Sequence, residues 1–380
     1  MALVSKLPSA GVTIFTVMSK LAADTGAINL GQGFPDFDCD PALVDAVAAK
    51  MHAANNQYCP MPGQLALREA LAAKIERLYG RRYDAVSEIT VTSGATEALF
   101  CAITALVHPG DEVIVLEPAY DSYVPAIQLS GGRPVFVTLR GPDYRVDWDA
   151  VRRALTPKTR LILLNSPHNP TGTIFGAEDL AALRAVLTHT DAWVASDEVY
   201  EHIVFDGRRH ESLARDAEIA SRTIVISSFG KTYHTTGWKV GYTAAPAALT
   251  AEIRNIHQWV TFTVNSAIQL AYADLVTQDP DCAALSGFYQ AKRDLFLSLM
   301  EGSRFRPLPS AGTFFQLMDY GAISGEADRD FAIRVTKEHG VASIPLSPFL
   351  HTTGGETVVR FCFAKKDATL RAAAERLRRI

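Results

Sequence analysis

Between residues 89 and 226 the sequence alternates short apolar runs with stretches of helical character. Six such runs occur, at 89–92, 113–116, 135–138, 161–164, 193–195 and 223–226. Short apolar runs separated by helical segments are typical of parallel strands that are buried on both faces of a sheet. The alternation therefore predicts an α/β fold in which helices cover both faces of a mostly parallel sheet.

The segments around this region carry helix signals. Asp40 followed by Pro41 has the form of a helix start, with an acidic N-cap and proline at the first helical position. The segment 64–80 places leucine and isoleucine on one stripe and ends at Gly80, which suits a left-handed helix end. After about residue 246 the chain is predicted to be helical through Arg304. A strand at "GTFFQLMDY", a helix near 330–339, a strand at "VVRFCFA" and a terminal amphipathic helix are predicted to follow.

These patterns predict two domains. A length of 380 residues exceeds the roughly 100 to 200 residues of a typical single domain. We expect a large domain at 41–280 that contains the sheet. We expect the N-terminal arm, 1–40, to join 281–380 in a smaller α+β domain.

Composition excludes several classes of protein. Lysine and arginine total 37 against 41 acidic residues, with no block of like charge, so a nucleic-acid partner is not expected. The five cysteines are scattered and form no C-x-x-C pair, which indicates neither a disulfide framework nor a metal site. No run of about 18 apolar residues and no secretory h-region occurs, so we expect a soluble cytoplasmic protein without a membrane partner.

Polar residues follow four of the predicted strands. In open α/β sheets ligands bind beyond the carboxyl ends of the strands, so these positions are candidates for a site. Small residues at a helix start suit a phosphate, and the later positions add a carboxamide, a carboxylate with a phenol, and an amine. The residues are Gly94, Ala95 and Thr96 after the first strand, Asn169 after the fourth, Asp197 and Tyr200 after the fifth, and Ser228 and Lys231 after the sixth.

Each of these features alone is usually structural. An aspartate at a strand end is commonly an N-cap, and a lysine in a loop is normally solvated. Their coincidence at one predicted sheet edge favours a single ligand. Pyridoxal phosphate forms an imine with a lysine amine, has a phosphate to anchor, and needs a carboxylate to keep its ring nitrogen protonated. The four features together therefore indicate a pyridoxal-phosphate site.

The motifs "NSPHNPTG", "SDEVYEHIVF" and "SSFGKTYHTTGWKVGY" resemble the signatures of the class I and II aminotransferases of pyridoxal-phosphate fold type I. The resemblance is ordered and extends from "GQGFPDFD" at residue 31 to "VVRFCFAKK" near residue 360. It implies a large domain with a mostly parallel seven-stranded sheet and a small α+β domain. It also implies pyridoxal 5'-phosphate as the cofactor.

Four further segments resemble the subgroup that contains the methionine aminotransferases and the kynurenine and glutamine transaminases. They are "NQYCPMPGQLALREA", "YDSYVPAIQLSGG", "HQWVTFTVN" and "IPLSPF". The resemblance implies transfer of an amino group from an L-amino acid to a 2-oxo acid by a ping-pong mechanism. A methionine-like or aromatic donor is expected, and a kynurenine- or glutamine-type transaminase is an alternative.

The same resemblance implies roles for individual residues. Lys231 would hold the cofactor covalently and act as the general base. Asp197 would pair with the ring nitrogen, while Asn169 and Tyr200 would hydrogen-bond the phenolic oxygen. Tyr120 would lie over the ring face. The phosphate would be bound by Gly94, Ala95, Thr96, Ser228 and Lys239, and by Tyr58 of the neighbouring subunit of a homodimer.

Arg360 is the candidate partner for the carboxylate of the substrate. It lies in "TVVRFCF", where apolar neighbours predict burial, and a buried arginine requires an anion. Gly33 fits a close backbone approach to the same carboxylate, together with Asn169. Aromatic candidates for the side-chain pocket are Phe15, Phe34, Tyr58, Tyr123 and His234.

Two departures qualify the family pattern. Some relatives have arginine where this chain has Lys239, and lysine offers a point charge instead of a planar fork. The sequence also shows no obvious second arginine to receive a side-chain carboxylate, as dicarboxylate-specific relatives have.

Two other functions are alternatives to the aminotransferase interpretation. A carbon–sulfur β-lyase on the same scaffold would share every cofactor residue and would differ only in the fate of the substrate carbanion. A transcription regulator with an aminotransferase-like module would carry a winged helix ahead of it. Because "GQGFPDFD" begins about 30 residues from the start, the sequence favours the enzyme.

Overall fold

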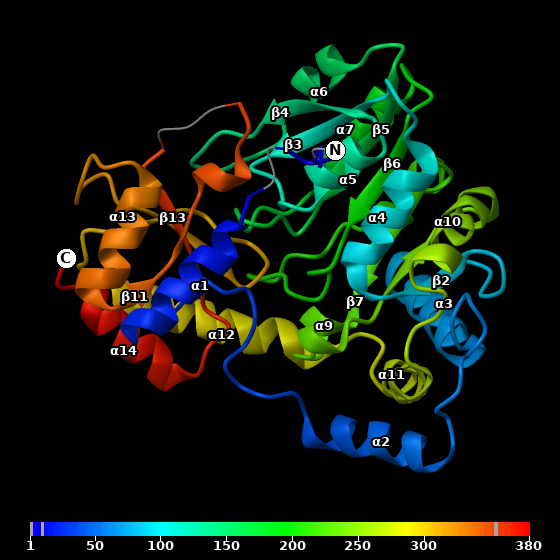
Figure 1. Ribbon diagram of the computed structural model, residues 1–380, viewed down its shortest axis with the longest axis horizontal. Helices are drawn as coiled ribbons and strands as arrows, with labels where there is room; N and C mark the ends of the chain where they lie inside the picture. Colours follow the sequence, from blue (N-terminus) through cyan, green and yellow to red (C-terminus); the bar gives the residue numbers. More distant parts are fainter. Residues whose placement is uncertain (1–2, 9–10, 353–355) are drawn as a thin grey trace.

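The computed structural model describes residues 3–8, 11–352 and 356–380 and is built around a seven-stranded sheet (Figure 1). The strands are β2 (Ile89–Thr92), β3 (Glu112–Glu117), β4 (Arg133–Thr138), β5 (Thr159–Asn165), β6 (Trp193–Asp197), β7 (Thr223–Ser228) and β8 (Gly241–Ala244). Their order in the sheet is β2-β8-β7-β6-β5-β3-β4, and β8 alone of the seven is antiparallel to its neighbours. All six predicted strands and the α/β class are therefore confirmed, while β8 was not predicted as a strand.

Helices cover both faces of this sheet. One face packs against α4 (Gly94–Leu106), α5 (Tyr123–Leu129) and α10 (Ala247–Val260). The other face packs against α6 (Trp148–Ala154) and α7 (Ala177–Leu187), and near β2 and β8 against α3 (Leu65–Tyr79) and α11 (Ser266–Gln278). Alternate residues of one strand enter opposite cores: Val113 and Val115 face α4, whereas Ile114 and Leu116 face α7.

The predicted helix signals are confirmed at two helix ends. The Asp40 side chain accepts a hydrogen bond from the Ala42 backbone N–H at the start of α2 (Pro41–His52). Gly80 closes α3 in a left-handed conformation with φ of 77°. The buried stripe of α2 is shorter than the helix itself, because Leu43 near its start is buried but Met51 near its end is exposed.

The remaining strands build two small sheets. The four-stranded antiparallel sheet has the order β12-β13-β10-β9. Its strands are β9 (Arg306–Pro307), β10 (Phe315–Asp319), β12 (Ile344–Pro345) and β13 (Val358–Cys362). A parallel pair joins β1 (Ile28–Asn29) to β11 (Val341–Ala342). The start of the chain is thereby connected to its last third, as the expected small domain requires.

Helices complete this second part of the molecule. They are α1 (Ile14–Thr25), α12 (Ala283–Met300), α13 (Asp328–Arg334) and α14 (Asp367–Leu377), and Figure 1 shows them together on the side opposite α10. The helix predicted near 330–339 is α13 followed by a π-helical turn at Val335–His339. Within the described ranges, no helix combines the length and apolar character that crossing a membrane would require.

A buried polar network connects α3, β7 and β8 to the turn that follows β6. Glu201 follows β6, and its side chain is 2% exposed. Its carboxylate accepts hydrogen bonds from Lys74 Nζ (2.7 Å), Ser227 Oγ (2.7 Å) and Tyr242 Oη (3.1 Å), and also from Tyr79. These donors come from α3, β7 and β8, so a single carboxylate holds three elements together. The nearby Lys74 ammonium holds the pKa of Glu201 far below its usual range, in opposition to burial.

Replacing Glu201 with glutamine is expected to lower the free energy of unfolding by about 3 kcal/mol, because the Lys74 charge would stay buried without a counter-charge. Urea denaturation at pH 7 measures this effect. The matched control is Asp24→Asn, which removes the exposed Lys20–Asp24 pair and should cost at most about 0.5 kcal/mol. A Glu201→Gln cost as small as the control would contradict the role given to the network.

Candidate active site

The carboxyl ends of β5, β6 and β7 lie at one edge of the large sheet. Asn165, the last residue of β5, is in register with Asp197, and Asp197 is in register with Ile226 of β7. Lys231 follows β7 in the short helix α9 (Phe229–Thr232). Side chains that are far apart in sequence therefore meet at this edge.

A cavity of about 330 Å³ lies at this edge. Phe15, Gln32 and Phe315 contribute to its lining from the N-terminal segment and the four-stranded sheet. Twelve of the thirteen predicted site residues also line it, namely Gly33, Gly94, Ala95, Thr96, Tyr120, Asn169, Asp197, Tyr200, Ser228, Lys231, Lys239 and Arg360. The thirteenth, Tyr58, lies on the molecular surface, where its side chain is 82% exposed.

The N-terminus of α4 forms one end of the cavity. Gly94 has φ of 73°, and the Ser93 side chain makes no capping hydrogen bond, so the first backbone N–H groups of the helix remain available for a ligand. A Cβ added at Gly241 would lie 2.8 Å from the Ala95 nitrogen, so glycine is required for β8 to approach so closely. Lys239 Nζ would lie 3.3 Å from a Cβ at Gly94. Backbone N–H groups and an ammonium thus converge where a phosphate would fit.

Lys231 is partly buried and lies among the residues that line the cavity. Its Nζ donates a hydrogen bond to the Gly33 carbonyl at 3.1 Å and lies 5.4 Å from the centre of the Phe314 ring. Burial, together with the positive charges of Arg360 and Lys239, lowers the pKa of Lys231 to about 8. A substantial fraction of this amine is therefore neutral and nucleophilic near neutral pH.

Asp197 is also buried, and burial raises its pKa to about 6. Its Oδ2 accepts a hydrogen bond from Tyr123 Oη at 2.7 Å. Tyr123 was expected in the side-chain pocket, but it is a buried partner of this carboxylate, because its position at the start of α5 places it against the end of β6. The carboxylate is therefore oriented by a phenol and can hold a cationic ring nitrogen within the cavity.

Arg360 lies at the opposite side, on β13 between two neighbouring strands, and is 1% exposed. Its Nη1 donates to Asn169 Oδ1 at 2.8 Å and its Nη2 to the Gly31 carbonyl at 2.9 Å, while Nε has no partner among the described residues. Burial lowers its pKa to about 10, so it still carries its charge at pH 7. Within the described ranges no carboxylate forms an ion pair with this guanidinium, which leaves its charge available for an acidic ligand.

Aromatic rings enclose the Arg360 guanidinium. The ring centres of Phe315, Phe15 and Phe349 lie 3.9, 5.2 and 5.3 Å from its central carbon. Phe15 lines the cavity, as predicted. His234 packs outside the lining, 5.0 Å from Phe37 in a T-shaped pair, and Phe34 lies over Lys365 at 5.3 Å; both predictions for the pocket were wrong.

Sequence reasoning missed several residues that orient the site. Asn165 donates from Nδ2 to the Asp197 carbonyl and accepts from the Asn169 N–H, both at 2.8 Å. Its place at the end of "LILLN" was a signal that could have identified it. Phe315 and Phe349 carried no such signal, because only the packing of the four-stranded sheet brings them to Arg360.

Together the fold and the cavity define a pyridoxal-phosphate-dependent enzyme of fold type I. The model of the family described as "Aminotransferase class I and II" matches residues 25–377. The chain belongs to this family, and it is accordingly a pyridoxal-phosphate-dependent aminotransferase. The cavity residues fit the cofactor, since an uncapped helix N-terminus, a buried carboxylate and a partly buried amine face one space.

Similar proteins include characterised aminotransferases. The chain is 52% identical over 377 residues to methionine aminotransferase of Escherichia coli, covering 99% of this chain and 98% of that protein. The solved structure of Escherichia coli YbdL, for which a methionine aminotransferase function was identified, superposes with a TM-score of 0.98 at 51% identity and covers 100% of both chains. A kynurenine–oxoglutarate transaminase of Dictyostelium discoideum is 36% identical, covering 97% of this chain and 94% of that protein.

The lowered pKa of Lys231 predicts how fast the cofactor-free protein attaches pyridoxal phosphate. Only the neutral amine attacks an aldehyde, so the rate should rise with pH through a midpoint near 8. At pH 8 the neutral fraction would be roughly 125-fold higher than for an ordinary lysine with a pKa of about 10.4. Stopped-flow absorbance of the covalent adduct, followed by borohydride reduction and peptide mapping, measures both the rate and the position.

The control is Lys231→Ala, which should give no reduced adduct at this peptide. A midpoint near 10, or label on a different lysine, would contradict the assignment.

Proposed function

We propose that ten of the twelve cavity residues, all except Gly33 and Arg360, hold pyridoxal phosphate in one defined orientation. Lys231 forms the covalent link, and Asp197 pairs with the ring nitrogen. The phosphate lies on the N-terminus of α4 with Ser228 and Lys239, and Tyr120 covers the ring. The Asn169 Nδ2 and the Tyr200 hydroxyl donate to the phenolic oxygen. The hydrogen bond from Arg360 to Asn169 Oδ1 supports this role, because it directs the Asn169 Nδ2 group away from Arg360.

The bound cofactor supplies an electron sink for the carbanion at the substrate Cα. The protein residues bind and orient the amino acid around that atom. Arg360 binds the α-carboxylate with its planar fork, assisted by the Gly33 backbone. Lys231 removes the Cα proton and returns it during the exchange, and its lowered pKa suits a base that works near neutral pH. The single observation that carries this proposal is the pair of cations, partly buried Lys231 and fully buried Arg360, that face one cavity.

We infer that the amino donor is methionine-like or aromatic, with methionine preferred, and that a 2-oxo acid accepts the amine. The similarity to the Escherichia coli methionine aminotransferase supports methionine, and the lining supports an apolar side chain. Three lysine and arginine residues line the cavity, Lys231, Lys239 and Arg360, and each has a role already. No cation of the described lining is left for a second carboxylate on the substrate.

We further propose that the enzyme is a homodimer in which Tyr58 reaches the phosphate of the neighbouring subunit. An exposed apolar patch supports this assembly. It consists of Tyr58 together with Trp259, Val260 and Phe262, the last of which lies 5.4 Å from Tyr58 in a T-shaped pair. Burial of this patch against a second copy would remove large apolar side chains from water. The domain division at 41–280, with 1–40 joined to 281–380, and the cytoplasmic location also remain proposals.

Arg360→Ala is expected to raise KM for the amino donor roughly 100-fold or more, while the cofactor remains bound. The physical reason is the loss of two charge-assisted hydrogen bonds, worth about 3 kcal/mol together. Initial-rate kinetics and the absorbance of the bound cofactor measure both properties. Arg254→Ala is the control, since Arg254 also donates to carbonyl groups, those of Val86 and Ile89, but lies outside the cavity. An unchanged KM would remove Arg360 from the substrate site.

A panel of amino donors with several 2-oxo acids tests the reaction. Methionine and aromatic donors should show the highest kcat/KM, and aspartate should be roughly 100-fold worse because its second carboxylate finds no cation. Ping-pong kinetics are expected. Faster turnover of kynurenine or glutamine would indicate the alternative transaminase type. Release of pyruvate and ammonia from cystathionine would indicate a carbon–sulfur β-lyase.

A further inference from the structure

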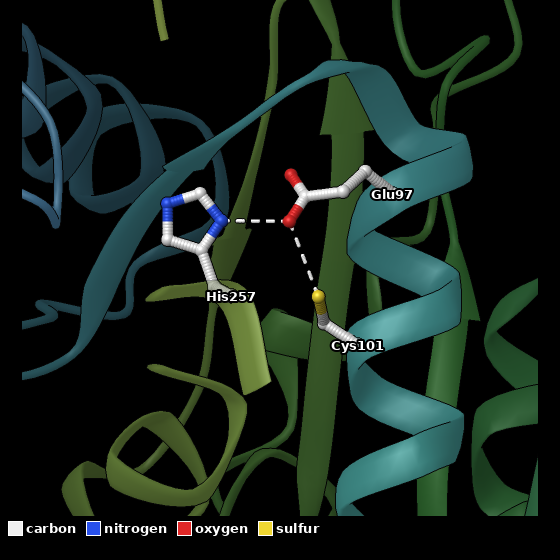
Figure 2. Close-up of side chains that lie close together, drawn as sticks. All are labelled: Glu97, Cys101 and His257. Carbon is white, nitrogen blue, oxygen red and sulfur yellow. Dashed lines mark hydrogen bonds and ion pairs between the residues drawn. The ribbon is translucent and has the colours of Figure 1, made fainter. Parts of the chain in front are cut away.

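Outside the cavity, Glu97, Cys101 and His257 form a buried cluster between α4 and α10 (Figure 2). His257 Nδ1 lies 2.7 Å from Glu97 Oε1, and the Cys101 thiol lies 3.1 Å from the same oxygen. The His257 side chain is fully buried, and that of Glu97 is 7% exposed. The transamination chemistry described above uses none of these three groups.

Hydrogen bonds already occupy the three side chains. His257 Nε2 lies 3.2 Å from the Met61 carbonyl, which can only accept, so this nitrogen carries a proton. The other Glu97 oxygen, Oε2, accepts from the Ser93 N–H at 2.7 Å. The ligand atoms lie close enough together for a metal site, but each of these side chains is already hydrogen-bonded within the protein. The cluster therefore acts as a structural link.

One end of the link is the phosphate site. Ser93 is the N-cap of α4, and its backbone N–H is held by Glu97. The next three residues, 94–96, present the backbone N–H groups that face the cavity. Because Glu97 is also hydrogen-bonded to His257, the imidazole helps to hold the start of α4 in place.

The other end of the link is the segment that carries Tyr58. Met61 lies three residues after Tyr58, and its carbonyl accepts from His257. Two residues of α11 hold the flanks of this segment: Ser266 Oγ donates to the Gln57 carbonyl at 2.6 Å, and Gln269 Nε2 donates to Cys59 Sγ at 3.2 Å. The Tyr58 side chain remains exposed at the surface.

We propose that His257 is a positioning residue. It connects the start of α4, where the phosphate of its own subunit binds, to the segment whose Tyr58 reaches the partner subunit. Through Nδ1 it fixes Glu97 and the start of α4, and through Nε2 it fixes Met61 and so the direction of Tyr58. This inference rests on the proposed homodimer with Tyr58 acting across the interface. It goes further by making each cofactor site depend on an imidazole in the other subunit.

Two isosteric substitutions separate the two contacts. The asparagine amide nitrogen occupies roughly the position of Nδ1 and the glutamine amide nitrogen roughly that of Nε2. His257→Asn therefore keeps the Glu97 contact and loses Met61. His257→Gln keeps the Met61 contact and loses Glu97.

Mixed dimers purified through two different tags test the proposal. One chain is wild type, and the other carries Lys231→Ala, so the covalent cofactor absorbance reports only the wild-type site. The Lys231→Ala chain carries one additional substitution, which is Tyr58→Phe, His257→Asn or His257→Gln, or it carries none. The dissociation constant for pyridoxal phosphate at the wild-type site should rise roughly tenfold with His257→Asn, a coupling within the usual range, and comparably with Tyr58→Phe. With His257→Gln, this dissociation constant should stay within about twofold of its value in the mixed dimer that carries Lys231→Ala alone.

The outcomes separate the two levels of the argument. If Tyr58→Phe in the other chain changes nothing, the cross-interface role of Tyr58 and this inference both fail. If Tyr58→Phe weakens binding but His257→Asn does not, the inference alone fails and the dimer proposal stands. Failure of His257→Asn chains to form mixed dimers, while His257→Gln chains form them, supports the Met61 link. If neither His257→Asn nor His257→Gln chains form mixed dimers, the proposed Met61 link is wrong, because His257 would then only stabilise the core.

Discussion

The Arg360 guanidinium joins the three parts of the chain that enclose the cavity. It is anchored on β13 of the four-stranded sheet, and it donates to Gly31 of the N-terminal segment and to Asn169 of the large sheet. Both partners are neutral oxygens, so they orient the guanidinium without neutralising its charge. A desolvated positive charge strongly favours an anion. The geometry of the cavity therefore depends on one residue whose charge is left for an anionic ligand.

Burial controls the chemistry of the other groups in the cavity. It lowers the pKa of Lys231 and raises that of Asp197, so each shift favours the neutral form of the group. For the lysine this produces a usable nucleophile and base. For the aspartate it means that the carboxylate is poorly solvated and is stabilised by a cationic partner such as a ring nitrogen. The same physical environment thus prepares both groups for a single cofactor.

The turn after β6 serves the cavity and the scaffold at once. Asp197 and Tyr200 line the cavity, whereas Glu198 and Glu201 point into the protein. Glu198 pairs with His210 at 2.9 Å, and Glu201 holds α3, β7 and β8. The density of polar residues in "SDEVYE" follows from this division, because a turn that must present two side chains accurately is itself fixed by two buried carboxylates.

The sequence by itself determined the six parallel strands and eight of the cavity residues, because strand periodicity and position after a strand are local properties. The family resemblance was needed to imply Tyr120 and Lys239. It could not reveal β8, a four-residue strand whose pairing with β2 and β7 depends on residues about 150 and 15 positions away. It misplaced Tyr123, Phe34 and His234, because an aromatic residue near a site can face either the cavity or the core. Only the tertiary structure decides such directions, since they depend on which elements pack together. The link from Glu97 through His257 to Met61 joins residues that no local pattern connects, and it forms only where α4, α10 and the segment before α3 pack together.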